Sequence, residues 1–235
     1  MLNETSSMDN QTSPIDFSTI LATSIHDMKN SLGIMTGLVQ RKLNEQSPPY
    51  DPDIVQLEFE ANRLSNSLMQ LLVLYKIESE RFLLSLDEYP AIDLLEDIVA
   101  QNRPLLDGKG IDLVVDCDAE IFVYCDFGLV CSIFNNLLNN AVRYTANRIR
   151  LSAIQKSPYA VLMIEDDGAG YPESILNRTF LDQSEIDFYT GNTGLGLLFA
   201  SHIAALHKGN GTAGYITLSN GGSYDGACFS LFLPC

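Results

Sequence analysis

The stretch Phe134–Thr145, FNNLLNNAVRYT, decides the fold, because it places repeated asparagines on a helix that is otherwise apolar. Asn136 and Asn140 are four residues apart and therefore share one helix face. Side-chain amides are costly to bury unless they find partners. An amide oxygen suits Mg²⁺ as a hard ligand, and Arg143 adds a cation that can reach a phosphate. The stretch predicts a face turned towards a polar ligand; helix capping and packing hydrogen bonds are the alternative interpretation.

Two glycine motifs follow the asparagine helix along the chain. In the stretch 164–172, IEDDGAGYP, a strand ends in a carboxylate and a glycine turn. Asp166 can accept the exocyclic amine of adenine, and Gly168 and Gly170 allow close approach of the backbone. The stretch 193–197, TGLGL, opens a helix, where free N–H groups and the positive end of the helix dipole attract phosphate. Each motif alone is also compatible with an ordinary structural turn.

A further polar group lies in the first helical segment, within residues 24–32, SIHDMKNSL. His26 follows the apolar position Ile25, which places its imidazole on the flank of the helix. His26 and Asn30 share a face, and Asp27 is the adjacent carboxylate that can take an imidazole proton. A nucleophilic nitrogen with a neighbouring base and an amide suits phosphoryl chemistry. A solvated surface histidine is the alternative.

Two apolar seams with alternating four- and three-residue steps predict two long helices, joined by a loop at the prolines of residues 47–52. They form an antiparallel hairpin that cannot cover both seams, so a second copy is expected to close a four-helix bundle in a homodimer. The seams consist of Leu21, Ile25, Met28, Leu32, Met35 and Val39, and of Ile54, Leu57, Ala61, Leu64, Leu68, Leu71 and Tyr75.

After Arg81 the pattern changes to short strands mixed with helices, which is typical of an α/β sandwich with one mixed sheet and helices on one face. Strands are expected at 111–116, 120–124, 148–154, 160–165, 215–219 and 227–233, and helices at 127–143 and 195–207. We therefore divide the chain into a disordered tail at 1–14, a hairpin at 15–82 and a second domain at 83–235.

The composition excludes several classes of function. The chain of 235 residues has 30 acidic and 14 basic side chains and a formal net charge of -16, which disfavours binding to nucleic acid or anionic lipid. No run approaches the roughly 20 apolar residues that span a bilayer, and the N-terminus does not resemble a secretion signal. We expect a cytoplasmic protein without membrane insertion. Its five cysteines lack CxxC spacing and are expected to be reduced and buried.

Taken together and in this order, the motifs resemble the catalytic core of the sensor histidine kinases of two-component systems. Residues 26–30 resemble the H-box of the dimerisation helix, 136–145 the N-box, 166–171 the first glycine box and 193–197 the second. The resemblance covers about residues 17–235. It implies an α+β protein in which a helical hairpin forms a dimeric four-helix bundle and precedes an ATP-binding sandwich of the Bergerat or GHKL type.

The resemblance implies an ATP-dependent protein-histidine kinase with ATP and Mg²⁺ as cofactors. It would autophosphorylate on His26, with Asp27 assisting deprotonation, and pass the phosphoryl group to an aspartate in the receiver domain of a response regulator. Asn30 would position water for phosphatase activity on the regulator, and Asn140 would coordinate Mg²⁺. The nucleotide would be bound by Asn136, Asn140, Arg143, Tyr144, Asp166, Gly168, Gly170, Thr193, Gly194, Leu195 and Gly196.

The chain departs from the family pattern at the second glycine box, where Asn192 replaces the first glycine. Because little sequence precedes Ile15, we expect the signal to come from a separate sensor protein. Two alternatives remain: a histidine phosphotransfer or phosphatase module with a weak ATPase site, and an ATP-binding switch protein of the anti-sigma-factor type. The anti-sigma type lacks a long hairpin that bears an H-box.

Overall fold

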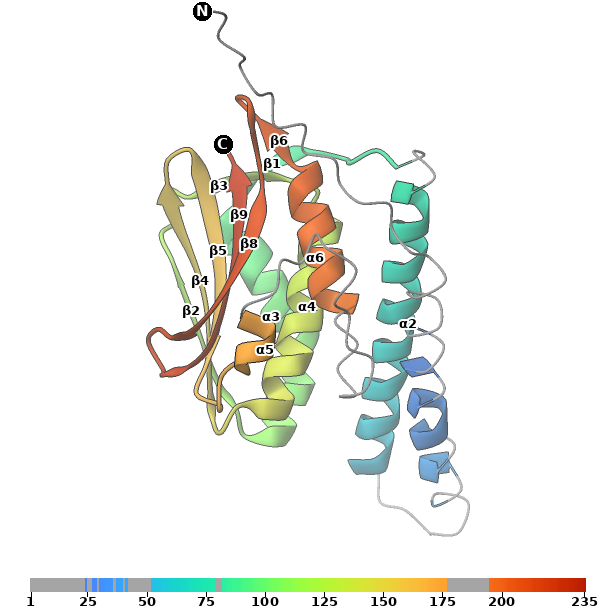
Figure 1. The fold of residues 1–235 in the computed structure, drawn as a ribbon. Coiled ribbons are helices and arrows are strands. Elements are labelled where there is room, and N and C mark those ends of the chain that lie inside the picture. The colour runs from blue at the N-terminus through green and yellow to red at the C-terminus, as the bar shows by residue number, and fades with distance from the viewer. Residues whose placement is uncertain are drawn as a thin grey trace, which may run out of the picture.

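The computed structural model describes residues 24, 27–28, 30–35, 37–39, 41, 52–78, 82–176 and 195–235. These residues form three layers (Figure 1): a twisted sheet, a layer of helices against one of its faces, and a helical layer outside those helices. The predicted tail, the proline loop, His26, Thr193 and Gly194 lie outside the described residues.

The main sheet has five strands in the order β2-β4-β5-β9-β8. Only β2 and β4 are parallel; the other neighbouring pairs are antiparallel. The mixed sheet predicted from the sequence is thus confirmed, with strand ends that differ by one or two residues. The strands are β2 (Asp112–Cys117), β4 (Arg148–Lys156), β5 (Tyr159–Asp166), β8 (Tyr215–Gly221) and β9 (Gly226–Pro234).

Two small two-stranded sheets complete the strand pairing of the described residues. β1 (Asp87–Pro90) pairs with β3 (Phe122–Cys125), and β6 (Lys208–Gly209) pairs with β7 (Thr212–Ala213). The expected strand at 120–124 therefore forms a separate ribbon with β1 and does not join the main sheet.

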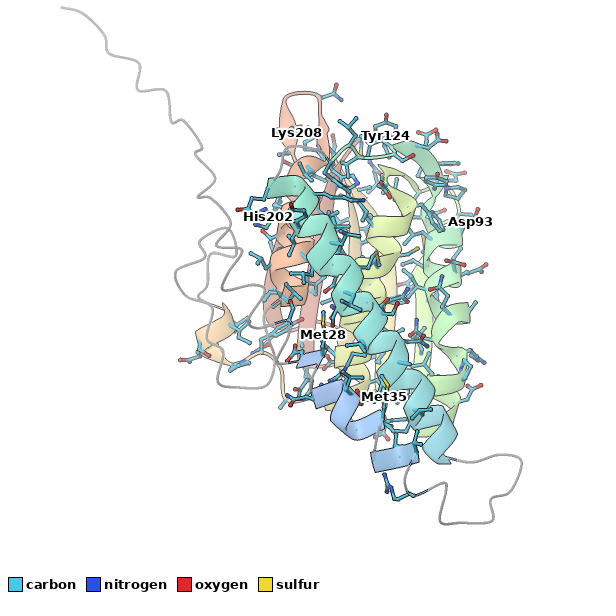
Figure 2. The ribbon with its side chains drawn as sticks, turned by 90° about the vertical axis from the view of Figure 1, so that its right-hand side faces the viewer. Met28, Met35, Asp93, Tyr124, His202 and Lys208 are labelled. Atoms are coloured by element: carbon cyan, nitrogen blue, oxygen red, sulfur yellow. The ribbon has the colours of Figure 1, made fainter. Side chains whose placement is uncertain are left out.

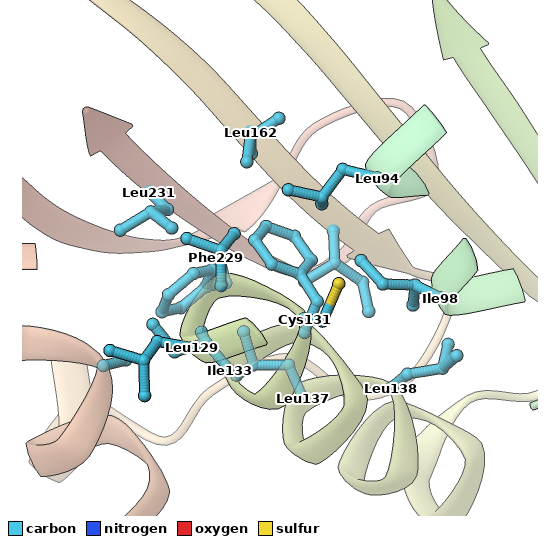
Figure 3. Packing of buried hydrophobic residues seen from close by; sticks show 14 of the residues in the cluster. Leu94, Ile98, Leu129, Cys131, Ile133, Leu137, Leu138, Leu162, Phe229 and Leu231 are labelled. Carbon is cyan, nitrogen blue, oxygen red and sulfur yellow. The ribbon is translucent and has the colours of Figure 1, made fainter. Parts of the chain in front are cut away.

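Three longer helices cover one face of the sheet (Figure 1): α3 (Ala91–Lys109), α4 (Phe127–Tyr144) and α6 (Leu195–Leu206). The short α5 spans Glu173–Leu176. Buried apolar side chains fill the space between helices and sheet, Phe229 and Leu231 of β9 among them (Figure 3). Phe134 of α4 meets Phe229 edge to face, with ring centroids 6.1 Å apart. Apolar burial of this extent supplies the main stabilising contribution to the fold.

The outer layer consists of α2 (Pro52–Glu78) and the helical residues between 24 and 41, which lie beside it (Figure 2). Arg63 Nε donates to Ser31 Oγ at 3.0 Å and joins the two helices. α2 packs on α6 and α4 through a face that includes Val73 and Leu74. No helix within the described part of the chain is long and apolar enough to cross a bilayer.

The predicted seam of α2 is only partly buried in a single chain. Leu68 is 49% exposed and its neighbour Leu72 is 51% exposed, whereas Gln70, Val73 and Leu74 are buried. The sequence therefore predicted the helix correctly but not which stripe contacts the rest of the same chain. The stripe that packs on α4 and α6 lies beside the seam, and the exposed leucines remain available to a second copy.

Candidate nucleotide-binding site

The asparagine helix α4 presents two different faces. Phe134 and Leu138 are fully buried in the core, while Asn136 is half-buried and Asn140 is exposed on another face. Asn140 Nδ2 donates to Asn136 Oδ1 at 3.2 Å, one helical turn away. Because the amide nitrogen of Asn140 is used in this way, its oxygen is directed away from Asn136. An exposed amide oxygen fits the preference of Mg²⁺ for hard oxygen ligands.

Asn135, a third asparagine of this helix, serves packing. Asn135 Nδ2 donates to Gln101 Oε1 at 2.8 Å, and Asn135 Oδ1 accepts from Asn102 Nδ2 at 2.6 Å. Both partners belong to α3, so Asn135 joins α3 to α4. The alternative interpretation of the asparagine run, packing hydrogen bonds, is therefore correct for Asn135. It does not account for the pair formed by Asn136 and Asn140.

Asp166 is the last residue of β5 and is only 7% exposed. Its Oδ1 accepts from Gly168 N at 2.8 Å and from Ala227 N at 3.2 Å. The chain passes so close at Gly226 that an added Cβ would lie 2.6 Å from the same Oδ1. Backbone contacts thus hold this carboxylate in one orientation, as recognition of an adenine amine requires.

The glycines after Asp166 bring the turn against two other elements. A Cβ at Gly168 would lie 2.4 Å from the carbonyl oxygen of Tyr144, so only glycine lets the turn contact the end of α4. Gly170 has φ +79°, which favours glycine. Asn220 of β8 then binds the next residue at both backbone groups: Tyr171 N donates to Asn220 Oδ1 at 2.6 Å, and Asn220 Nδ2 donates to Tyr171 O at 2.8 Å.

The neighbouring carboxylate, Asp167, holds the loop after α4 in place by hydrogen bonds. Its Oδ1 accepts from the Thr145 hydroxyl at 2.5 Å and from the backbone N–H groups of Ala146, Asn147 and Arg148 at 2.9, 2.9 and 3.0 Å. Burial alone would raise the pKa of Asp167, but these hydrogen bonds outweigh it and lower the pKa far below its usual range. Asp166 and Asp167 are adjacent in sequence and have different surroundings.

The second glycine box meets the asparagine helix at Gly196, in the first turn of α6. A Cβ at Gly196 would lie 2.8 Å from Asn136 Nδ2, so glycine lets the N-terminal end of α6 approach Asn136. Leu195 is buried in the core. The structure therefore brings Asn136, Asn140 and Gly196 together, while Gly168, whose N–H donates to Asp166, contacts the C-terminal end of the same helix α4 at Tyr144.

The remaining site residues predicted from the sequence lie at the end of α4 and in the hairpin. Arg143 and Tyr144 are exposed in the last turn of α4. In the hairpin, Asp27 is half-buried and Asn30 is exposed, and both are helical. His207, which follows α6, accepts from Asp126 N through Nε2 at 3.0 Å, and its Nδ1 contacts Ile203 O at 2.8 Å. It therefore supports the N-cap of α4.

Sequence reasoning missed four residues that shape the site. Gly226 and Asn220 come from the closing strands, Asp167 from the first glycine box, and Gln70 from α2, where its Oε1 accepts from Asn136 Nδ2 at 3.1 Å. A polar residue in an otherwise apolar stretch of helix was the available signal for Gln70. The double carboxylate was the signal for Asp167.

Comparisons with known proteins agree with this geometry. Residues 126–235 match the family model described as histidine kinase-, DNA gyrase B-, and HSP90-like ATPase. The sensor-like histidine kinase SenX3 of Mycolicibacterium smegmatis is 26% identical in an alignment of length 212 that covers 83% of this chain and 54% of SenX3. The virulence sensor histidine kinase PhoQ of Salmonella typhimurium is 24% identical over 193 residues, which are 82% of this chain and 39% of PhoQ. The chain thus spans less than two thirds of these relatives.

Solved structures share the fold. The histidine kinase AdeS of Acinetobacter baumannii superimposes with a TM-score of 0.62 at 22% identity, covering 89% of this chain and 97% of that chain. The histidine kinase ThkA, solved in complex with the response regulator protein TrrA, gives 0.60 at 20% identity and covers 91% of this chain and 60% of that chain. The predicted α+β fold with its GHKL-type sandwich is confirmed. The chain therefore has the fold of solved histidine kinases, is similar to sensor histidine kinases such as SenX3 and PhoQ, and contains a histidine kinase-, DNA gyrase B-, and HSP90-like ATPase domain at residues 126–235.

Proposed function

We propose that this chain is an ATP-dependent protein-histidine kinase that autophosphorylates on His26 and passes the phosphoryl group to an aspartate of a response regulator. The observation that carries the proposal is the meeting of the two nucleotide motifs on α4. Asn136 contacts Gly196, and Tyr144 contacts Gly168. Residues far apart in sequence thereby form one surface suited to a nucleotide.

The roles within the nucleotide site follow from the chemistry of each group. Asp166 accepts the exocyclic amine of adenine in a turn shaped by Gly168 and Gly170. Leu195 and Gly196 at the start of α6, together with Thr193 and Gly194 before them in the sequence, bind the phosphates through backbone N–H groups. Asn140 is the proposed direct ligand of Mg²⁺ through its amide oxygen, and Asn136, whose own oxygen accepts from Asn140 Nδ2, lies beside it at the nucleotide. Mg²⁺, when bound, neutralises charge on the phosphates. Arg143 and Tyr144 complete the site at the end of α4.

The transfer step uses the hairpin. An imidazole nitrogen of His26 forms a bond to the γ-phosphorus, the bond from that phosphorus to the bridging oxygen breaks, and ADP leaves with the electron pair. Asp27 accepts the imidazole proton. A regulator aspartate then takes the phosphoryl group as the phosphorus–nitrogen bond breaks. Asn30 positions water for the opposite activity, hydrolysis of the regulator's phosphoaspartate.

The partners we propose are a second copy of the chain, a receiver domain and a separate sensor protein. Dimerisation is supported by exposed apolar side chains on the hairpin, including Val39 at 44%, Leu68 at 49% and Leu72 at 51% exposure. We place the protein in the cytoplasm, because ATP is its phosphoryl donor. The net charge of -16 argues against nucleic acid as a partner.

The decisive experiment is labelling with γ-labelled ATP followed by treatment with acid. We expect incorporation that is lost in acid, as phosphohistidine is, and that is absent in His26→Ala. Asp166→Ala should abolish binding of ATP while leaving the fold intact. Label that persists in His26→Ala would contradict the proposal. Absence of saturable Mg-ATP binding at millimolar ATP would favour the phosphotransfer or phosphatase module.

A further inference from the structure

A buried polar contact joins the hairpin to the nucleotide site. Gln70 of α2 is 1% exposed, and its Oε1 accepts a hydrogen bond of 3.1 Å from Asn136 Nδ2 of α4. The nearby side chains of α2 that pack on the core, Val73 and Leu74, are apolar. Gln70 is therefore a polar group within an apolar contact between layers, and Figure 2 shows α2 crossing the helices behind it.

Asn136 is the central residue of a short chain of amides. It donates to Gln70, and its Oδ1 accepts from Asn140 Nδ2 at 3.2 Å. On its other side it contacts the start of α6, where a Cβ at Gly196 would lie 2.8 Å from Nδ2. With the nitrogen and the oxygen of Asn136 both engaged, its amide has one orientation. That orientation in turn directs the oxygen of Asn140 outward.

Burying Gln70 carries a free-energy penalty, so packing alone does not explain why a glutamine is present at this position. Gln70 Nε2 is buried and finds no acceptor among the residues that the structure describes. An unpaired buried donor is unfavourable, and an apolar side chain of the same length would avoid that penalty. The hydrogen bond to Asn136 is an interaction that a glutamine makes here and an apolar residue cannot.

The position of Gln70 along the hairpin is also informative. Arg63 contacts Ser31, and one heptad further in each antiparallel helix brings Gln70 level with Ser24. Ser24 is fully buried and lies two positions before His26 in the sequence. Gln70 thus lies level with Ser24 of the first helical segment and also contacts Asn136 of α4.

We propose that Gln70 is a positioning residue for binding of magnesium–nucleotide: it fixes the amide of Asn136, which orients Asn140 towards the metal. The inference rests on the proposed function. It predicts that loss of the Gln70 amide weakens binding that depends on Mg²⁺ and leaves binding of metal-free nucleotide unchanged.

The test compares Gln70→Met with Gln56→Met in the full chain. Methionine keeps the length of the side chain and removes the amide. Gln56 lies two heptads earlier on α2 and donates to Glu60 Oε1 at 3.2 Å, so it provides the same chemical change away from α4. Titration calorimetry with ATP, once with Mg²⁺ and once with EDTA, separates the two modes of binding.

We expect Gln70→Met to bind Mg-ATP about fivefold more weakly, the factor that corresponds to one net hydrogen bond. The affinity of Gln70→Met for ATP in EDTA should match that of the wild type. The affinities of Gln56→Met should match those of the wild type both with Mg²⁺ and with EDTA. Equal loss with and without Mg²⁺ would indicate a general defect in folding and overturn the proposal. Unchanged or tighter Mg-ATP binding by Gln70→Met would overturn it as well.

A double-mutant cycle adds a second readout. In an Asn136→Ala background, Gln70→Met should have no further effect on the Mg²⁺ dependence, because its route to Asn140 is already missing. Additive losses would contradict the route through Asn136. Normal Mg-ATP binding by Gln70→Met, in a protein whose wild type is labelled on His26, would refute the positioning role and leave the proposed function standing. A wild type that does not bind Mg-ATP would refute both.

Discussion

Replacing Asp167 by alanine tests whether this carboxylate stabilises the fold, in contrast to Asp166, which is proposed to bind adenine. Asp167 accepts hydrogen bonds from Thr145, Ala146, Asn147 and Arg148 at one oxygen. A net hydrogen bond to a charged group contributes about 1.5–3 kcal/mol when the partner is left unpaired. Here the four donors share one oxygen, and the exposed backbone donors can be rehydrated. We therefore expect a loss of about 3 kcal/mol in the free energy of unfolding, not the sum of four full bonds.

The assay is urea denaturation together with a thermal melt. At about 2–4 °C per kcal/mol for a chain of this size, the melting temperature should fall by about 6–12 °C. Asp112→Ala, at an exposed position of β2, is the matched control and should stay within about 0.5 kcal/mol of the wild type. A loss for Asp167→Ala no larger than that of the control would refute the reasoning.

The pKa of Asp167 gives the same prediction a pH dependence. The folded-state pKa is lowered, so the unfolded chain binds more protons at acid pH. The contribution is fully present above the unfolded pKa of about 3.9 and is lost as the pH falls below it. The difference in stability between wild type and Asp167→Asn should therefore shrink below about pH 4. A difference that grows on acidification would contradict the assignment.

Three further changes test other parts of the site. Gly226→Ala places a methyl group 2.1 Å from the backbone oxygen of Asp166 and 2.6 Å from its Oδ1, so the backbone must shift, and we expect a lower melting temperature together with weaker ATP binding, measured by calorimetry. Burial lowers the pKa of His207, so stability in urea should fall as the pH drops through about 6.5, and less steeply in His207→Gln, which can still accept from Asp126 N. Burial raises the pKa of Cys125 to about 12, so native protein should resist alkylation there at pH 8 while the exposed C-terminal cysteine reacts.

Much of the fold could be predicted because local pattern and tertiary structure agree. α4 has an apolar face and a polar face at helical spacing, and β5 is a short apolar run that ends in a carboxylate and glycine turn. α3 was not predicted, because it contains Pro104 and many polar residues within its length. Its helical state depends on packing against α4 and β2, which the local pattern does not report.

The site was predictable where a motif carries the chemistry, and not where a contact between distant segments does. Asp166 and Asn140 were predicted from their motifs, and their roles in nucleotide binding stay predictions. Asn135 and Asn136 look alike in sequence, and only the positions of α3 and α2 decide that one serves packing and the other contacts the hairpin. Asn220 acts across 49 residues on the backbone of Tyr171, and no local signal marks such a partner.

The place of β9 in the sheet has a consequence for synthesis of the protein in the cell. β9 (Gly226–Pro234) lies between β5 and β8 and pairs with both, although it is the last strand of the chain. During translation, β5 lacks one neighbour and β8 has no partner in the main sheet until residue 234 has left the ribosome. The sheet therefore cannot be completed before β9 is available, and a domain without β9 leaves one edge of β5 and the whole of β8 unpaired in the main sheet.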